Sequence, residues 1–233
     1  MIKIENEEVI GWEHAIRGMR NPLNSWDRSD SYENYLVDYE KNEIEDVIEI
    51  RHPYYRVGAD DISLMERLSK AGTDHRKFMR MITVYLDITA PLYWWKEFDT
   101  YKVGTVANSC STMHKIGSKE FTLEDFSHEH LILDEDSWTN YLGVLGFNID
   151  VLNKARGKYL ETKDKKYWWQ MIQLLPSSYN QKRTLMLNYE VLANICKSRK
   201  NHKLDEWKDF CKWIETLPYS ELITGEPKGE DNN

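Results

Sequence analysis

The sequence predicts an α+β fold, in which helices pack on a mixed or antiparallel sheet. Residues 82–88 alternate apolar and polar side chains, which is the period of a half-buried strand. Apolar residues recur at helical spacing over 136–160 and over 203–216, so both segments predict helices. The predicted strands and helices follow one another in a mixed order. A parallel α/β sheet would need a regular alternation of strand and helix, so the α+β class is favoured.

The N-terminal part of the chain predicts a short strand followed by two helices. Residues 2–4 can begin a strand, and residues 7–20 place apolar side chains at helical spacing. Asp60 and Asp61 predict the start of the second helix, because aspartate is a preferred N-cap. Gly72 predicts its end, since glycine is favoured just beyond the last helical turn.

The rest of the chain predicts further helices and one more strand. Pro91 lies where a helix can begin, because proline is tolerated in a first turn. Residues 166–175 predict a helix that Pro176 stops, and residues 182–188 predict a strand. Asn188 then predicts the cap of a helix that continues to about residue 200.

The chain is expected to form one domain. It has 233 residues, and no internal repeat and no linker rich in Pro, Gly or Ser divides it. We therefore predict a single domain over residues 1–224, followed by a flexible polar tail over residues 225–233. Residues 24–57, whose first part is acidic and rich in tyrosine, receive no assignment.

Charge and cysteine content argue against several classes of protein. The net charge of −8 disfavours a nucleic-acid binder, because phosphate neutralisation needs clustered Lys and Arg. The three cysteines form no C-x-x-C pair, which argues against a disulfide framework and a structural zinc site. His128 and His130 have no marked third ligand, so no metal is expected. No signal peptide and no membrane-spanning segment are recognised, and we expect a cytoplasmic protein without a membrane partner.

Arg199 is the best candidate for a binding residue on pattern alone. At about 100° per residue, it falls between Leu192 and Ile195 on the apolar stripe of its helix. A permanent cation in that position needs a partner, and an anionic ligand such as a phosphate would serve. The alternative is that the aliphatic part of the Arg199 side chain packs along the protein while the guanidinium group reaches solvent. Its positive charge would then interact favourably with the dipole at the helix C-terminus. On the pattern alone, this alternative is the commoner case.

Two other segments are candidate ligand-binding loops. The basic cluster at residues 75–80 can hold an anion, although a solvated turn is the commoner explanation. Residues 108–112 are small and polar, and such runs form hydrogen-bonding loops. No activating base lies at a fixed offset from Cys110, and no catalytic residue is assigned. The chain contains no glycine-rich phosphate loop.

Four stretches occur in an order that resembles the flavin-dependent thymidylate synthases, the ThyX family. They are residues 68–93, residues 96–114 in the place of the signature Arg-His-Arg-x-x-Ser-x-Asn-Glu-x-Ser-x-Arg, Leu174-Leu175-Pro176, and residues 188–202. The last is the most specific, because Asn188, Asn194, Arg199 and His202 follow the family pattern. The likeness extends from about Asp60 to about Leu217.

The resemblance implies a ThyX-like single domain that forms homotetramers and binds FAD between subunits. Members of the family methylate dUMP to dTMP with methylenetetrahydrofolate, using flavin hydride and NADPH, and need no protein nucleophile. The flavin carries the difficult chemistry, and the protein supplies placement and charge. The resemblance therefore implies an FAD-dependent methyltransferase of nucleotide biosynthesis.

The resemblance also assigns two sets of site residues. The residues implied to bind the nucleotide substrate are Arg199, Ser111 and Glu97, the last standing where the family usually has Gln. The residues implied to bind the flavin are His75, Lys102, Asn108, Asn188, Asn194 and His202.

The signature itself is eroded, and this leaves alternatives open. Thr100-Tyr101-Lys102 stands for Arg-His-Arg, and Met113 replaces the last arginine. Each lost arginine removes phosphate contacts worth about 1.5–3 kcal/mol. One alternative is a flavin- or nucleotide-binding relative that makes no dTMP. The other is an interaction protein that keeps only the fold.

Overall fold

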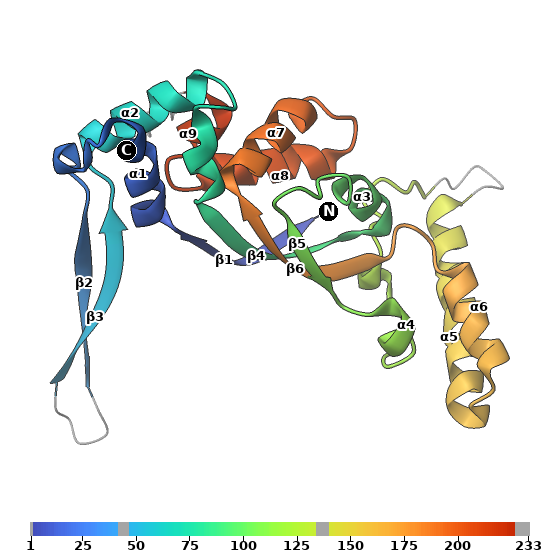
Figure 1. The fold of residues 1–233 in the computed structure, drawn as a ribbon. Coiled ribbons are helices and arrows are strands. Elements are labelled where there is room, and N and C mark those ends of the chain that lie inside the picture. The colour runs from blue at the N-terminus through green and yellow to red at the C-terminus, as the bar shows by residue number, and fades with distance from the viewer. Residues whose placement is uncertain (1, 42–46, 134–139, 227–233) are drawn as a thin grey trace. The chain divides into compact units, whose positions relative to one another are not determined.

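A computed structural model describes residues 2–41, 47–133 and 140–226 (Figure 1). The chain divides into two compact units, and it passes through each of them more than once. The first unit comprises Met1–Glu7, Tyr85–Met186 and His202–Phe210, and the second comprises Glu8–Val84, Leu187–Asn201 and Cys211–Asn233. The single domain over residues 1–224 stays a prediction. No helix among the described residues is both long enough and apolar enough to span a membrane.

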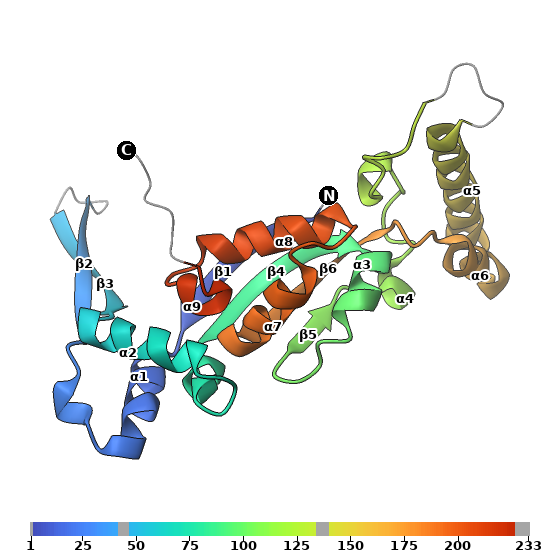
Figure 2. The same cartoon turned by 90° about the horizontal axis from the view of Figure 1, so that it is seen from above.

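A four-stranded sheet in the order β1-β4-β6-β5 confirms the predicted α+β class. Its strands are β1 (Lys3–Ile10), β4 (Thr83–Pro91), β5 (Val106–Ser109) and β6 (Asn180–Asn188). Strands β5 and β6 pair antiparallel, with Val106 opposite Met186 (Figure 2). Along β4, the side chains of Val84, Leu86 and Ile88 are buried while those between them are more exposed. The alternation that predicted this strand is thus confirmed.

The strand at the N-terminus is longer than predicted, and the first helix is shorter. Residues 7–10, predicted as helix, continue β1, and α1 spans Trp12–Arg20. Gly11 separates the two with a φ of 95°, a left-handed conformation that favours glycine. A Cβ at this position would also overlap the carbonyl oxygen of Met81. This turn ends the strand at a point that apolar spacing alone does not reveal.

Most of the segment that received no assignment forms a separate two-stranded sheet. Strands β2 (Tyr32–Lys41) and β3 (Val47–Arg56) pair antiparallel, with Tyr32 opposite Arg56 (Figure 1). Two short 3-10 turns, Asn21–Leu23 and Trp26–Arg28, precede this hairpin.

Helix α2 (Ala59–Lys70) receives its cap from a residue that the sequence did not indicate. The carboxylate of Asp30 accepts hydrogen bonds from the backbone N–H groups of Asp60 (3.0 Å) and Asp61 (3.1 Å). The prediction that Asp60 and Asp61 cap the helix is therefore wrong. Asp61 is buried instead, and its Oδ1 accepts a hydrogen bond from Arg20 Nε at 2.6 Å. Gly72, with a φ of 104°, follows the helix as predicted.

The remaining helices lie close to their predicted positions. They are α3 (Leu92–Phe98), α5 (Tyr141–Thr162), α6 (Lys165–Leu174), α7 (Tyr189–Arg199) and α8 (Asp205–Thr216). The short α9 (Glu221–Thr224) follows them and was not predicted. The predicted start of α5 at residue 136 lies outside the described residues. Residues 108–112 are not one loop, because 106–109 belong to β5 and α4 (Thr112–Lys115) begins soon after.

Each unit has its own buried core. In the first unit, the rings of Trp94, Phe98 and Trp207 pack on one another, and α5 packs against α6. In the second unit, Trp12 contacts the rings of Tyr189 and Tyr219 edge-on.

Candidate functional site

The nine predicted site residues are divided between the two units. The first unit contains Glu97, Lys102, Asn108, Ser111 and His202, and the second contains His75, Asn188, Asn194 and Arg199.

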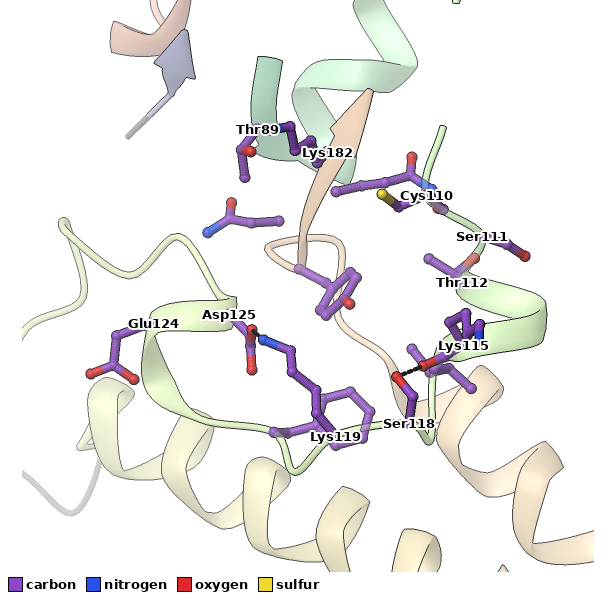
Figure 3. A pocket seen from close by; sticks show the side chains of 15 residues that line it. Thr89, Cys110, Ser111, Thr112, Lys115, Ser118, Lys119, Glu124, Asp125 and Lys182 are labelled. Atoms are coloured by element: carbon purple, nitrogen blue, oxygen red, sulfur yellow. Dashed lines mark hydrogen bonds and ion pairs between the residues drawn. The ribbon is translucent and has the colours of Figure 1, made fainter. Parts of the chain in front are cut away.

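The first unit has a pocket of about 340 Å³ with Ser111 in its wall, which we call the Ser111 pocket (Figure 3). Its walls come from the end of β4, the segment that enters α4, residues 118–125, and the start of β6. Three lysines, Lys115, Lys119 and Lys182, line it together with several hydroxyl groups and two carboxylates, Glu124 and Asp125. Ammonium and hydroxyl groups are suited to binding an anion such as phosphate.

Backbone and side-chain hydrogen bonds fix the position of Ser111. Its hydroxyl oxygen accepts a hydrogen bond from His114 N (3.1 Å), so its hydrogen can donate to another group. The preceding residue, Cys110, donates its N–H to Lys182 O (2.9 Å) and accepts from Gln181 Nε2 (2.8 Å). These bonds hold the segment at Ser111 against β6, where Ser111 lines the pocket.

The three lysines of the Ser111 pocket differ in their partners. Lys119 pairs with Asp125, as Figure 3 shows, and this hydrogen bond raises the pKa of Lys119. Lys182 Nζ lies 3.0 Å from Asp87 Oδ2 and takes part in a second ion pair. Among the described residues, the Lys115 ammonium has no ion pair. Lys115 is therefore the lysine of this pocket that a ligand can recruit without breaking an ion pair of the described residues.

Asp87 is held in its ionised form beside this pocket. Hydrogen bonds from Thr184, Asn6 and Lys182, in this order of importance, lower its pKa to about 2. Thr184 Oγ1 donates to Asp87 Oδ1 at 2.6 Å, and Asn6 Nδ2 donates to Oδ2 at 2.9 Å. A carboxylate with this many donors stays charged at any pH near neutrality.

Glu97 and His202, which are predicted to bind different ligands, lie next to each other. Glu97 Oε2 accepts a hydrogen bond from the buried Trp207 Nε1 at 2.9 Å and lies 3.4 Å from His202 Nε2. His202 Nδ1 accepts a hydrogen bond from Leu204 N at 3.2 Å. This bond places the proton of the neutral ring on Nε2, which points to Glu97.

The other two predicted residues of the first unit lie apart from the Ser111 pocket. Lys102 is exposed and lines a pocket of about 250 Å³ with Tyr101 and Thr105. Asn108 is exposed on β5, opposite Thr184 on β6. Neither Lys102, Asn108, Glu97 nor His202 lines the Ser111 pocket.

In the second unit, three polar side chains meet beside α7. Arg76 Nε donates to Glu190 Oε1 (3.1 Å), and Arg76 Nη2 donates to Asn194 Oδ1 (3.1 Å). Glu190 is only 8% exposed, and its Oε2 has no hydrogen-bond partner in the described residues. Arg80 Nε lies 3.8 Å from that oxygen. The basic cluster at residues 75–80 therefore supplies the counter-charge for a buried carboxylate.

The remaining predicted residues of this unit lie at or near helix ends. Asn188 caps α7, because its side-chain oxygen accepts a hydrogen bond from Val191 N at 3.0 Å. His75 is exposed at the start of a 3-10 turn, Arg76–Arg80. Arg199 is half-buried in the last turn of α7, near the fully buried Leu192 and Ile195. Its role as a nucleotide-binding residue stays a prediction.

Sequence reasoning did not identify the lysines of the Ser111 pocket or Glu190. Lys115 and Lys119 lie four residues apart, whereas Lys182 comes from a distant segment, so no spacing relates all three. Glu190 could have been identified from the sequence, since it stands between the apolar Tyr189 and Val191, which are buried at the start of α7. An acid in that setting needs a cationic partner.

Comparisons with known proteins relate this chain to solved structures alone. No family model matches its sequence, and neither does any curated protein. The structure of the flavin-dependent thymidylate synthase ThyX from Helicobacter pylori, complexed with FAD and dUMP, is similar at a TM-score of 0.65. It has 15% sequence identity, over 96% of this chain and 98% of that chain.

A second similar structure is the UMP/dUMP methylase PolB from Streptomyces cacaoi bound with 5-Br dUMP. It has a TM-score of 0.55 and 12% identity, over 93% of this chain and 89% of that chain. The resemblance recognised in the sequence is thus confirmed for the fold. The chain has the fold of the flavin-dependent thymidylate synthases.

Proposed function

We propose that this chain is a flavin-dependent thymidylate synthase-like enzyme that methylates dUMP to dTMP. Methylenetetrahydrofolate would supply the carbon and NADPH the reducing equivalents. The observation that carries the proposal is the likeness over 96% of the chain to a thymidylate synthase that holds FAD and dUMP. A cytoplasmic homotetramer belongs to the same proposal.

The Ser111 pocket is the proposed site of the nucleotide phosphate. The Ser111 hydroxyl can donate a hydrogen bond, and the Lys115 ammonium forms no ion pair with a described residue. Hydrogen bonds from such donors to a phosphate dianion are the strong kind in proteins. The resemblance adds Arg199 and Glu97 to the nucleotide-binding residues.

The residues proposed for the flavin are chemically suited to it. His75, Asn188 and Asn194 in the second unit, with Lys102, Asn108 and His202 in the first, offer imidazole, amide and ammonium groups. Glu190 Oε2 is buried without a hydrogen bond beside the arginine that holds Asn194. A ligand N–H or O–H would satisfy this acceptor. When bound, FAD supplies hydride transfer, and these side chains bind and orient it.

One observation favours a second candidate function, which is binding of flavin or nucleotide without dTMP formation. Lys119 and Lys182 are paired with carboxylates, and Arg76 and Arg80 face Glu190. These cations therefore do not replace the arginines that the signature has lost.

Two measurements distinguish these functions. The first is the visible absorption spectrum of the purified protein, repeated on the supernatant after denaturation and on protein incubated with FAD. The second is dTMP formation from dUMP, with UMP tested in parallel because PolB is a UMP/dUMP methylase. Released FAD together with dTMP supports the synthase, and FAD without a methylated product supports the second function. A colourless protein that takes up no FAD rules out the synthase, and it rules out the second function as well if calorimetric titration shows that the protein binds no dUMP.

A further inference from the structure

The second unit has another pocket, formed where α2, α7 and α9 meet. It has a volume of about 350 Å³, and we call it the Lys200 pocket. Lys70 comes from the end of α2, and Lys197 and Lys200 come from the end of α7. Arg76 and Glu226 complete the charged part of the lining. None of the nine predicted site residues lines this pocket.

The charges of this pocket do not cancel within the described residues. Glu190 offsets Arg76, and Glu226 Oε1 lies 2.8 Å from Lys200 Nζ. Lys70 and Lys197 have no ion pair with a described residue. The C-termini of α2 and α7 contribute about half a negative charge each. About one positive charge therefore remains, in a chain whose net charge is −8.

The contact between Glu226 and Lys200 indicates that the pocket can bind an anionic group. Its carboxylate already occupies an anion position on Lys200. Its side chain is 68% exposed, and an exposed ion pair of this kind is weak. When Glu226 turns away, the excess rises to about two positive charges, which matches a phosphate dianion.

The rest of the lining is apolar. Ala193 on α7, together with Leu222 and Ile223 on α9, provides an apolar wall. The volume is at the lower end of the range for small-molecule sites, about 300–1,000 Å³. The pocket is therefore suited to a compact ligand that carries both an anionic group and a carbon skeleton.

We propose that the Lys200 pocket binds a small organic phosphate, and that the ligand's phosphate displaces Glu226 from Lys200. This site is separate from the Ser111 pocket, and it does not depend on the function proposed above. Lys70, Lys197 and Lys200 hold the phosphate, and the apolar wall contacts the carbon skeleton.

The test is calorimetric titration of the full chain with ribose 5-phosphate and with inorganic phosphate at low salt. A double variant, Lys70→Gln with Lys197→Gln, should bind the sugar phosphate at least about tenfold more weakly. The variant Glu226→Gln should bind it up to about fivefold more tightly, because the competing carboxylate is gone. If the lysines only offset the partial negative charges of the helix C-termini, Glu226→Gln would not increase the affinity for the sugar phosphate.

Two further variants locate the binding. The double variant Lys154→Gln with Lys158→Gln on α5 makes the same change in net charge and should bind as the wild type does. Lys115→Gln should leave this affinity unchanged, which separates the site from the Ser111 pocket. Absence of binding by the wild type would overturn the proposal, and so would equal affinities for wild type, the Lys70/Lys197 variant and Glu226→Gln. Equally tight binding of inorganic phosphate would overturn the organic class of the ligand.

Discussion

Of the three lysines in the Ser111 pocket, we expect Lys115 to contribute most to binding the phosphate of dUMP. Lys119 is held by Asp125, and Lys182 Nζ lies 3.0 Å from Asp87. A ligand that recruits either lysine has to share it with a carboxylate. Lys115 has no such competitor among the described residues.

The expected magnitude follows from this difference. A hydrogen bond between an ammonium group and a phosphate is worth about 1.5–3 kcal/mol. Lys115→Gln should therefore weaken dUMP binding about 10- to 150-fold. The matched control is the double variant Lys119→Gln with Asp125→Asn, which removes one positive and one negative charge together. Because it leaves the net charge of the pocket unchanged, it should bind dUMP within about threefold of the wild type.

The assay is calorimetric titration with dUMP at two salt concentrations, since screening weakens contributions from charges at the surface. The variant Lys154→Gln on α5 controls for the change in the net charge of the whole chain. An unchanged dissociation constant for Lys115→Gln would refute the reasoning. An equal loss in the charge-neutral double variant would also refute it, because pairing with Asp125 would then not matter.

The other predictions concern the predicted site residues, the buried Asp61 and the partly buried Asp87. Arg199→Ala should weaken nucleotide binding at least about tenfold with an unchanged circular dichroism spectrum, and unchanged affinity would reject the assignment. Asn194→Ala combined with His202→Ala should lose FAD, measured by visible absorption, and a fully flavinated variant would contradict this. Asp61→Asn should lower the free energy of unfolding in urea by about 3–5 kcal/mol, because it leaves a buried arginine without its charged partner. Asp87 has a pKa of about 2 in the folded chain against 3.8 ordinarily, so its stabilising effect should be lost as the pH falls from 3.8 to 2. The free energy of unfolding of Asp87→Asn, measured over the same pH range, should not show this loss.

The sequence predicted those elements whose periodicity reflects one buried face. Strand β4 is the clearest case, because it buries alternate side chains. The hairpin of β2 and β3 has no such pattern, since the consecutive residues Tyr35, Leu36 and Val37 are all exposed. No alternation marks a strand whose two faces are both solvated.

Contacts between distant residues could not be predicted from the sequence, because the tertiary fold determines them. The cap of α2 comes from Asp30, about thirty residues before the N–H groups that it accepts. Glu97 and His202 were assigned to different ligands, yet their side chains lie 3.4 Å apart. The tertiary fold brings these side chains together, and their spacing along the chain does not predict the contacts.

The sequence also leaves open whether the basic cluster at residues 75–80 replaces the lost signature arginines, and the structure allows an energetic answer. Arg76 donates to Glu190 and Asn194, and Arg80 lies within ion-pair distance of the same carboxylate. Removing one partner from a buried ion pair costs about 3–5 kcal/mol. One charge-assisted contact to a phosphate returns only about 1.5–3 kcal/mol. A ligand phosphate that recruited Arg76 would therefore lose more free energy than it gained. We expect this cluster to stay with Glu190 and not to replace the lost arginines.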